Sequence, residues 1–443
     1  MLREERRAPT QNGRRNTGRP WSALARCAHT PDVMDELASG PTTISPTAST
    51  PPARAGRIAN TVGYYAAFVA LGLVTASLGP TLPGLAENTR THLSEISYLF
   101  TARSSGYLAG SFLGGRLYDR MPGHRVMVTV LVVAAAMMGL APTLSLLWLL
   151  AAVLLILGAA EGAVDVGGNT LLVWVHGHKV GPFMNGLHFF FGAGAFLSPI
   201  IVAQAVLIGG DITWAYWALA LLILPAVIWL LRLPSPAPQA DSEDSPAEGL
   251  RRVNRLLVAL IALFFFLYVG AEVGFGGWIY TYAVALDLSG ETTAAYLTSA
   301  FWGALTVGRL LAIPVAARFR PRFILLSDLV GCLVSVGAIL LWSNSSTATW
   351  LGTLGLGLSM ASIFPTTLSL AERRMPITGQ VNGWFFVGAS TGGMTLPWLI
   401  GQLFESIGPQ VTMVAILVDL VVAVGFFVAL ILHSARPVNV SRE

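Results

Sequence analysis

Residues 181–199 read GPFMNGLHFFFGAGAFLSP, and residues 379–397 read GQVNGWFFVGASTGGMTLP. Both stretches are apolar and rich in glycine, and both end on a proline. The matched positions are Asn185-Gly186 with Asn382-Gly383, and Pro199 with Pro397 within one residue. The similarity predicts an internal duplication, in which a segment of the first half of the chain recurs in the second half.

The composition places the chain among membrane proteins. Of the 443 residues, 54% are hydrophobic and 11% are charged, with a mean hydropathy of +0.65. Soluble proteins have roughly a quarter of their residues charged. The arginines fall between apolar runs and form no basic face, which argues against a nucleic-acid partner. The two cysteines, Cys27 and Cys332, are too few for a disulfide framework or a metal site.

Twelve segments have the ~20 apolar residues that a bilayer-spanning helix requires. They cover about 59–80, 94–115, 126–142, 146–174, 181–207, 213–232, 256–284, 293–315, 322–342, 348–371, 378–402 and 410–432. With the duplication, they predict an all-α membrane protein of twelve transmembrane helices in two pseudo-symmetric six-helix bundles. The expected parts are a disordered cytoplasmic tail (1–57), an N-terminal bundle (58–232), a Pro-, Ser- and acid-rich linker (233–255), a C-terminal bundle (256–433) and a short cytoplasmic tail (434–443).

The distribution of positive charge predicts the orientation. With the N-terminus in the cytoplasm, 24 of the 27 Lys and Arg residues lie in segments on the cytoplasmic side. Arg90 falls in an outer loop, while Arg103 and Arg309 lie within spans. Because cytoplasmic loops of membrane proteins carry the excess of positive charge, both termini are expected in the cytoplasm. We expect a monomer in the plasma (cytoplasmic) membrane.

The loop GGRLYDRMPGHR at 114–125 resembles the motif G-x-x-x-D-R-x-G-R-[KR] of the major facilitator superfamily. Gly115, Asp119, Arg120 and Gly123 fill the motif, with one residue more than usual between Asp and Gly. Three further stretches are similar to the fucose/proton-symporter branch, and the second of them resembles the sodium-dependent glucose transporter members. They are AAEGAVDVGGNTLL (159–172), YVGAEVGFGGWIYTYA (268–283) and SIFPTTLSLAE (362–372).

The resemblance implies uptake of a hexose coupled to a cation, H⁺ or Na⁺, without a cofactor. In proton-coupled relatives a Glu in span 4 and an Asp in span 1 are functional, and Glu161 matches the Glu. Alignment on Pro83 places Gly79 at the Asp position, so the two-carboxylate mechanism does not carry over whole. The residue types are compatible with either coupling ion. A proton needs one titratable carboxylate, and sodium needs a cage of several oxygens.

One helix face of the segment 146–174 carries two carboxylates and an amide. Glu161, Asp165 and Asn169 are four residues apart and therefore form a stripe. An Asp at the bilayer centre is unfavourable by ~2.5–3.5 kcal/mol, so the stripe is expected to face the interior or a water-filled cavity. We interpret Glu161 as the acceptor for the coupling cation and for sugar hydroxyls, supported by Asp165 and Asn169. The alternative is an interior polar lock, in which one carboxylate pairs with Arg103.

The second half supplies a further candidate carboxylate, Glu272. The glycines around it indicate a broken or closely approached helix, as at transporter sites. Trp278 is either an aromatic platform for a sugar ring or part of the helix packing, and His188 is either a ligand-binding or an ordinary interior histidine. The expected hydrogen-bonding residues are Asn185, His188, Asn382 and Trp384, and the expected gating residues at the cytoplasmic face are Gly115, Asp119, Arg120 and Arg309. Asp328 is expected in helix packing, and Asp419 receives no role.

No nucleophile–base arrangement, phosphate-binding glycine loop or Walker sequence is present, so we expect neither an enzyme nor an ATP-driven pump. The sequence predicts a secondary transporter that takes up a neutral hexose by alternating access within the lipid bilayer. One alternative is an efflux antiporter of sugars or drugs, although the usual Gly-Pro-x-x-Gly-Gly signature of span 5 is replaced by GAGAFLSPII. Another alternative is a nutrient sensor with a transporter fold that does not translocate.

Overall fold

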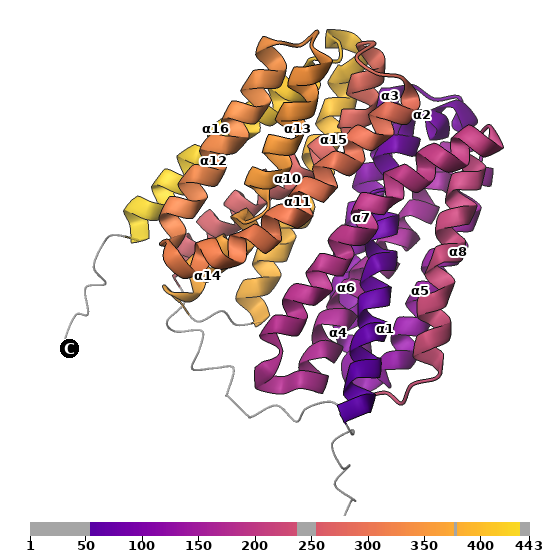
Figure 1. The fold of residues 1–443 in the computed structure, drawn as a ribbon, viewed down its shortest axis with the longest axis vertical. Helices are drawn as coiled ribbons and strands as arrows, with labels where there is room; N and C mark the ends of the chain where they lie inside the picture. Colours follow the sequence, from indigo (N-terminus) through magenta and orange to yellow (C-terminus); the bar gives the residue numbers. More distant parts are fainter. Residues whose placement is uncertain (1–53, 237–253, 376–378, 435–443) are drawn as a thin grey trace, which may run out of the picture. The chain divides into compact units, whose positions relative to one another are not determined.

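The computed structural model describes residues 54–236, 254–375 and 379–434, and within them every regular element is a helix (Figure 1). The first half contains α1 (Arg54–Thr75), α2 (Leu78–Thr89), α3 (Leu93–Ile96), α4 (Tyr98–Arg120), α5 (Gly123–Leu140), α6 (Leu147–His176), α7 (Gly181–Gly209) and α8 (Ile212–Leu231), with short 3-10 turns η1 (Ala141–Thr143) and η2 (Gly177–Lys179). The second half contains α10 (Arg255–Ala285), α11 (Glu291–Arg318), α12 (Pro321–Leu341), α13 (Ser346–Met360), α14 (Ile363–Glu372), α15 (Gly379–Ile407) and α16 (Val411–Ser434).

The expected tails and linker lie mostly outside the described residues. Residues 1–53, 237–253 and 435–443 belong to these segments. Helix α1 begins at Arg54, so its first turn lies inside the range 1–57 that the sequence analysis assigns to the tail.

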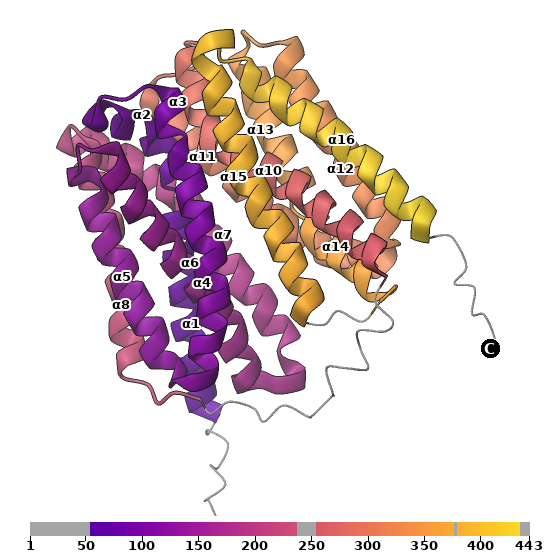
Figure 2. The ribbon, with the colours of Figure 1, turned by 180° about the vertical axis from the view of Figure 1, so that it is seen from behind.

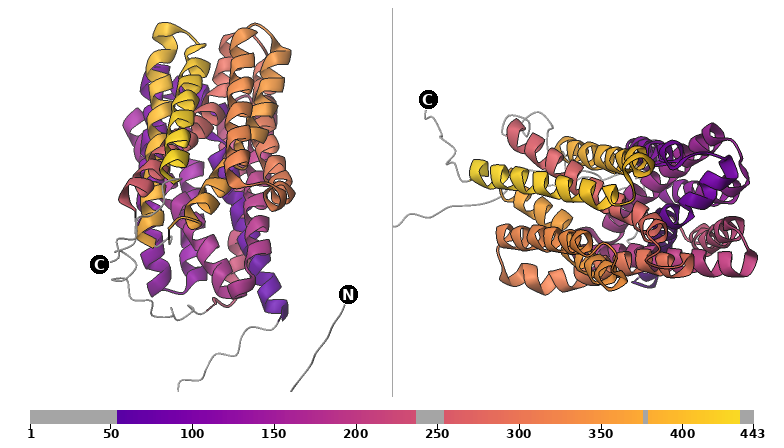
Figure 3. Two further views of the ribbon diagram at one scale, coloured as in Figure 1. Left: turned by 90° about the vertical axis from the view of Figure 1, so that its left-hand side faces the viewer. Right: turned by 90° about the horizontal axis from the view of Figure 1, so that it is seen from above.

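Ten of the described helical segments are long and apolar enough to cross a membrane. The two expected spans that fall short of this criterion are α4 and α15. Helix α4 carries four charged residues, and α15 is rich in Gly, Ser, Thr and Gln. The long helices run side by side in a common direction (Figure 3), as bilayer-spanning helices do.

Two of the expected spans are broken, one near its end and one in its middle. The segment 59–80 was expected as one span, but α1 ends at Thr75 and α2 begins at Leu78. The segment 348–371 is similarly divided into α13 and α14. The prediction of one continuous first span is therefore wrong. Hydropathy reports how apolar a segment is and does not indicate where its helical hydrogen bonds are interrupted.

Helix α10 shows the opposite behaviour, since it continues over 31 residues through its glycine-rich part. Its glycines allow close approach instead of a break. A Cβ on Gly270 would lie 3.3 Å from the Gly392 carbonyl oxygen, and one on Gly277 would lie 2.7 Å from the Phe100 ring. Of the two readings of this segment, the closely approached helix is confirmed.

The helices of each half pack mainly on one another (Figures 1 and 2). In the first half α4 packs on α6 and α1 on α7, while in the second half α10 packs on α15 and α11 on α13. The halves meet where α4 contacts α15, where α7 contacts α11, and where α2 contacts α10.

The duplicated stretches form equivalent helices. Both α7 and α15 have 29 residues, and their internal prolines, Pro199 and Pro397, stand at the nineteenth position. Each packs on the first long helix of its own half, α1 or α10, and on one helix of the other half, α11 or α4. These two helices therefore line the junction between the halves.

Candidate functional site

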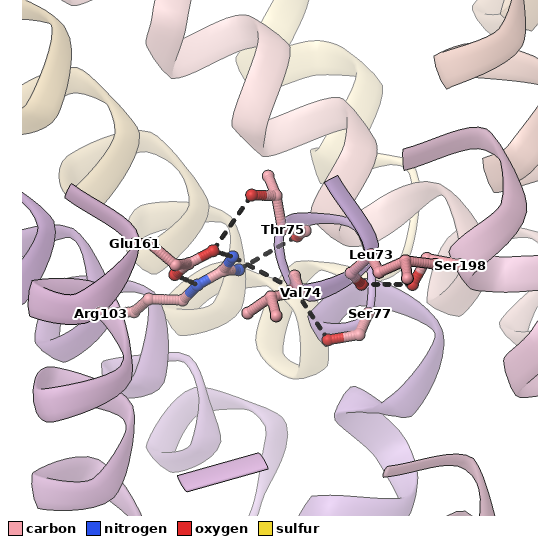
Figure 4. Close-up of polar contacts among 7 residues, drawn as sticks. All are labelled: Leu73, Val74, Thr75, Ser77, Arg103, Glu161 and Ser198. Atoms are coloured by element: carbon pink, nitrogen blue, oxygen red, sulfur yellow. Dashed lines mark hydrogen bonds and ion pairs between the residues drawn. The ribbon is translucent and has the colours of Figure 1, made fainter. Parts of the chain in front are cut away.

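An ion pair lies at the centre of the first half (Figure 4). Arg103 on α4 donates from Nε to Glu161 Oε2 at 2.7 Å and from Nη2 to Oε1 at 2.5 Å. Thr75 Oγ1 also donates to Glu161 Oε1, at 3.0 Å. Glu161 is only 3% exposed, so both oxygens of a buried carboxylate are engaged. This geometry corresponds to the alternative prediction from the sequence, an interior polar lock in which a carboxylate pairs with Arg103.

The same arginine caps the broken first span. Where α1 ends, its last carbonyl groups lose their helical donors, and in a membrane each needs another one. Arg103 donates from Nη1 to the Thr75 oxygen at 3.1 Å and from Nη2 to the Val74 oxygen at 3.3 Å. The remaining caps are hydroxyls: Ser77 donates to the Val74 oxygen at 2.8 Å and Ser198 to the Leu73 oxygen at 2.6 Å. The Arg103–Glu161 pair therefore holds the break between α1 and α2 together (Figure 4).

Asp165, one turn further along α6, has a different environment. The hydroxyl of Tyr107 donates to its Oδ2, and Asn169 donates to its Oδ1 at 3.0 Å. The side chain is partly exposed. Arg309 on α11, in the other half, interacts with it electrostatically, although no ion pair within 4.0 Å joins them in the described residues. Asp165 is thus the carboxylate of the stripe that faces the junction between the halves.

A cavity of about 300 Å³ opens between helices of the two halves. Three of the predicted site residues, Asn185, His188 and Arg309, line it together. The remaining lining side chains come from α7, α11, α12 and α14: Phe189, Thr306, Leu310, Ala312, Ile313, Ala316, Phe319, Pro321, Ile324, Ser362, Phe364, Pro365, Thr366, Ser369 and Arg373. Arg309, which the sequence analysis assigns to a gate, therefore lies in a cavity wall.

Glu272 lies on α10 and is partly exposed. Glu272 interacts electrostatically with Tyr268, and Arg309 also acts electrostatically on Tyr268. The Tyr268 hydroxyl donates to the Met360 carbonyl oxygen at 3.2 Å, at the end of α13. Glu272 thus lies near the residue that caps the second helix break, whereas Glu161 is hydrogen-bonded directly to the residues at the first break.

Trp278 lies in the packed core and presents no free ring face. It is fully buried, its Nε1 donates to the Pro397 oxygen at 3.0 Å, and its ring stacks on Phe404 with centroids 5.2 Å apart. The packing alternative describes Trp278. Asn382 and Trp384 do not line the cavity, and Trp384 is 56% exposed. The equivalence of Asn185 and Asn382 in the duplication thus does not extend to the cavity wall.

The two ends of the junction differ. At the end that holds α3, Gln402 on α15 donates to the Ser94 oxygen at 2.6 Å, and Glu405 accepts from the Leu93 backbone at 3.0 Å. At the other end, Asp119 and Arg120 are exposed, and neither forms an ion pair within the described part of the chain. Gly115, one turn earlier on the same helix, is partly exposed, and a Cβ added there would lie 4.0 Å from the Val166 side chain.

Sequence reasoning missed Thr75, Tyr107 and Ser362 as parts of the polar interior. Tyr107 had a usable signal, because it follows Arg103 by one turn as Asp165 follows Glu161. The two contacts between α4 and α6, Arg103–Glu161 and Tyr107–Asp165, therefore lie one helical turn apart along the interface of these helices. Thr75 and Ser362 flank helix breaks that hydropathy alone does not reveal.

The family model described as Major Facilitator Superfamily matches residues 64–397 of this chain. The chain belongs to this superfamily. It is an integral multi-pass membrane protein, and its predicted membership is confirmed.

Among relatives, sodium-dependent glucose transporter 1A of Mus musculus is 33% identical over 374 residues, covering 76% of this chain and 88% of that protein. The predicted likeness to sodium-dependent glucose transporter members is thereby confirmed. A mutant form of the nucleoside transporter NupG superimposes with a TM-score of 0.70 at 14% identity, covering 85% of this chain and all of that one. A D-xylose-proton symporter has a TM-score of 0.66 at 13% identity, with 83% and 97% covered. Similarity at this identity shows the fold.

Proposed function

We propose that the protein is a secondary active transporter that takes up a neutral hexose together with a cation, H⁺ or Na⁺, by alternating access. The name of its relative, a sodium-dependent glucose transporter, supports this substrate class, since glucose is a hexose. In this proposal twelve helices form two six-helix bundles, 58–232 and 256–433. The segments 1–57, 233–255 and 434–443 lie in the cytoplasm, and the protein works as a monomer in the plasma membrane.

The observation that carries the proposal is the contrast between the two carboxylates of α6. Glu161 is buried and has both oxygens occupied by Arg103 and Thr75. Asp165 is partly exposed, and Arg309 of the other half, which lines the cavity, acts on it electrostatically without an ion pair in the described residues. Ionisable groups inside membranes mark ion and proton pathways.

We assign the coupling cation to Asp165. Tyr107 and Asn169 hold this carboxylate in place, and the Tyr107 oxygen lies beside it as a further ligand for a sodium ion. Neutralising Asp165 with a proton or sodium removes its electrostatic attraction to Arg309, so ion binding changes an interaction that acts between the halves without a direct ion pair in the described residues. Glu161 is then a positioning residue that fixes Arg103 at the helix break.

The sugar is assigned to the cavity. Its wall combines polar side chains, Asn185, His188 and Thr306, with apolar ones, as ligand pockets do. Arg309 lines it from the second half, and a guanidinium group is a hydrogen-bond donor that suits sugar hydroxyls. The closed contacts at the α3 end and the cavity at the other end correspond to an inward-open arrangement, in which substrate leaves toward the cytoplasm.

The test is uptake by purified protein in liposomes, with labelled glucose or fucose and with a sodium or a proton gradient imposed separately. The expected result is accumulation above equilibrium under one gradient and only equilibration without a gradient. Glu291→Gln, an exposed carboxylate at the start of α11, is the matched control and is expected to accumulate sugar normally. Sugar binding without flux would support a sensor, and accumulation driven by an opposing gradient would support an antiporter.

A further inference from the structure

A second pocket, of about 320 Å³, adjoins the transport cavity at Pro321 and Arg373 and is surrounded by arginines. Two of them stand at the turn between α11 and α12, and two follow the end of α14. The lining residues are Arg320, Arg322, Arg373, Arg374, Pro321, Leu370 and Ile431. Four positive charges from two distant parts of the chain therefore converge on one space.

These arginines have no acidic neighbour in the pocket. No Asp or Glu lines it, and none of the four forms an ion pair within 4.0 Å in the described ranges. Arg322 lies over an aromatic ring, with 4.8 Å between its Cζ and the centroid of the Phe323 ring. The positive-inside rule explains why arginines occur in these loops, but not why they surround one pocket without a carboxylate. Like charges this close repel one another unless an anion lies between them.

The surroundings of the pocket are apolar on the side of the peripheral helices. Leu370 and Ile431 form part of the wall, and Phe319 and Phe323 beside it are 59% and 53% exposed. Exposed aromatic rings next to basic residues are typical of the membrane–water interface. The charge distribution along the chain assigns this end to the cytoplasmic side, where anionic lipids give the membrane a negative surface.

We propose that this pocket binds the phosphate group of an anionic phospholipid of the cytoplasmic leaflet. Arg320, Arg322, Arg373 and Arg374 would hold the phosphate through paired N–H donors, the geometry in which guanidinium groups bind phosphate. The acyl chains would lie on the apolar surface beside Leu370 and Ile431. Basic pockets between helices at this depth bind lipid headgroups of this kind. The site is separate from the transport site, with which it shares only Pro321 and Arg373 in the wall.

The test is binding of soluble short-chain lipids to the full-length protein in detergent micelles, read by native mass spectrometry. The probes are dioctanoyl phosphatidylglycerol, dioctanoyl phosphatidylcholine and inorganic phosphate. The variant carries Arg320→Gln and Arg374→Gln, which leave Arg373 and the transport cavity intact. The matched control is Arg125→Gln, an exposed arginine at the start of α5 outside the pocket.

Phosphatidylglycerol is expected to bind more tightly than phosphatidylcholine. Loss of each arginine is expected to weaken its binding about fivefold, so the double variant weakens it roughly 25-fold. The control variant is expected to bind as the unmodified protein does. Equal binding of the two lipids, or equal weakening in the control, would overturn the proposal. Displacement of phosphatidylglycerol by inorganic phosphate at equal concentration would overturn the lipid assignment and indicate a soluble phosphate. These outcomes are independent of whether sugar is transported.

Discussion

The two helix breaks have the same sequence pattern but different caps. The first is Ala-Ser-Leu-Gly-Pro at residues 76–80, and the second is Ala-Ser-Ile-Phe-Pro at 361–365. In each, the alanine stands four residues before a proline, which has no N–H to donate to that alanine's carbonyl group. The same missing backbone hydrogen bond, between an alanine carbonyl group and the proline four residues later, therefore interrupts one helix in each half of the chain.

The caps differ in charge and in access. The first break is held by the buried Arg103–Glu161 pair, with Glu161 only 3% exposed. At the second break Tyr268 donates to the Met360 oxygen, and Ser362 donates to Asp328 Oδ2. The second break also contributes Ser362 and other residues to the cavity wall. A charged cap thus stabilises the break within the packed first half, while neutral hydroxyls suffice where the break borders the cavity. We infer that the first break is rigid and that the second is able to change during transport.

The largest expected effect is that of Arg103→Met. The substitution leaves Glu161 as an unpaired buried charge and removes two donors from the end of α1. Breaking a buried ion pair by removing one partner costs about 3–5 kcal/mol. We expect a loss of this size in the free energy of unfolding, measured by denaturant titration of the purified protein in micelles.

A double variant sharpens this prediction. Arg103→Met combined with Glu161→Met replaces the pair by apolar side chains, which is often neutral for stability. We expect it to recover about 2 kcal/mol or more of the loss. A double variant as unstable as Arg103→Met would show that the carbonyl caps, and not the unpaired carboxylate, account for the effect.

At the second break the expected effect is smaller. Tyr268→Phe removes one neutral hydrogen bond to the Met360 oxygen, which is worth about 0.5–1.5 kcal/mol. The matched control is Tyr282→Phe on the same helix, because the Tyr282 hydroxyl is buried without a partner in the described structure. The same titration is expected to show no loss for the control. A loss for Tyr268→Phe that equals that of Arg103→Met would contradict the difference between the two caps.

The smallest expected effect lies away from both breaks. Glu405→Gln at the α3 end weakens the contact of an exposed carboxylate with the Leu93 backbone and with His92. Exposed charge contacts contribute about 0.2–1 kcal/mol. We expect a change within this range, again from denaturant titration. A change above about 2 kcal/mol would mean that this end, and not the first break, is the main rigid contact.

Part of this arrangement could be predicted from the sequence. The duplication correctly paired α7 with α15, because matched glycines and prolines produce matched helices. The stripe on α6 was located because intramembrane carboxylates stand out against an apolar background. The break at Ala76 was missed, since residues 59–80 remain apolar throughout and only Pro80 marks the interruption. The glycines of α10 left two readings open, because close packing and helix breaking have the same glycine signal, and the structure shows the closely approached helix.

The assignment of roles to Glu161 and Asp165 required the structure. Which carboxylate Arg103 reaches depends on how α4 and α6 pack, and residue spacing along one helix does not contain that information. The same holds for Arg309, whose place in the cavity wall depends on the packing of α7 against α11.

The most direct test compares Asp165→Asn with Glu161→Gln in liposomes, measuring both sugar counterflow and gradient-driven accumulation. If Asp165 carries the coupling cation, Asp165→Asn retains counterflow but accumulates sugar only to equilibrium. Glu161→Gln, which disturbs the cap of the first break, is expected to lose both activities together with stability. Normal accumulation by Asp165→Asn, under the gradient that drives the unmodified protein, would contradict the assignment of the coupling site.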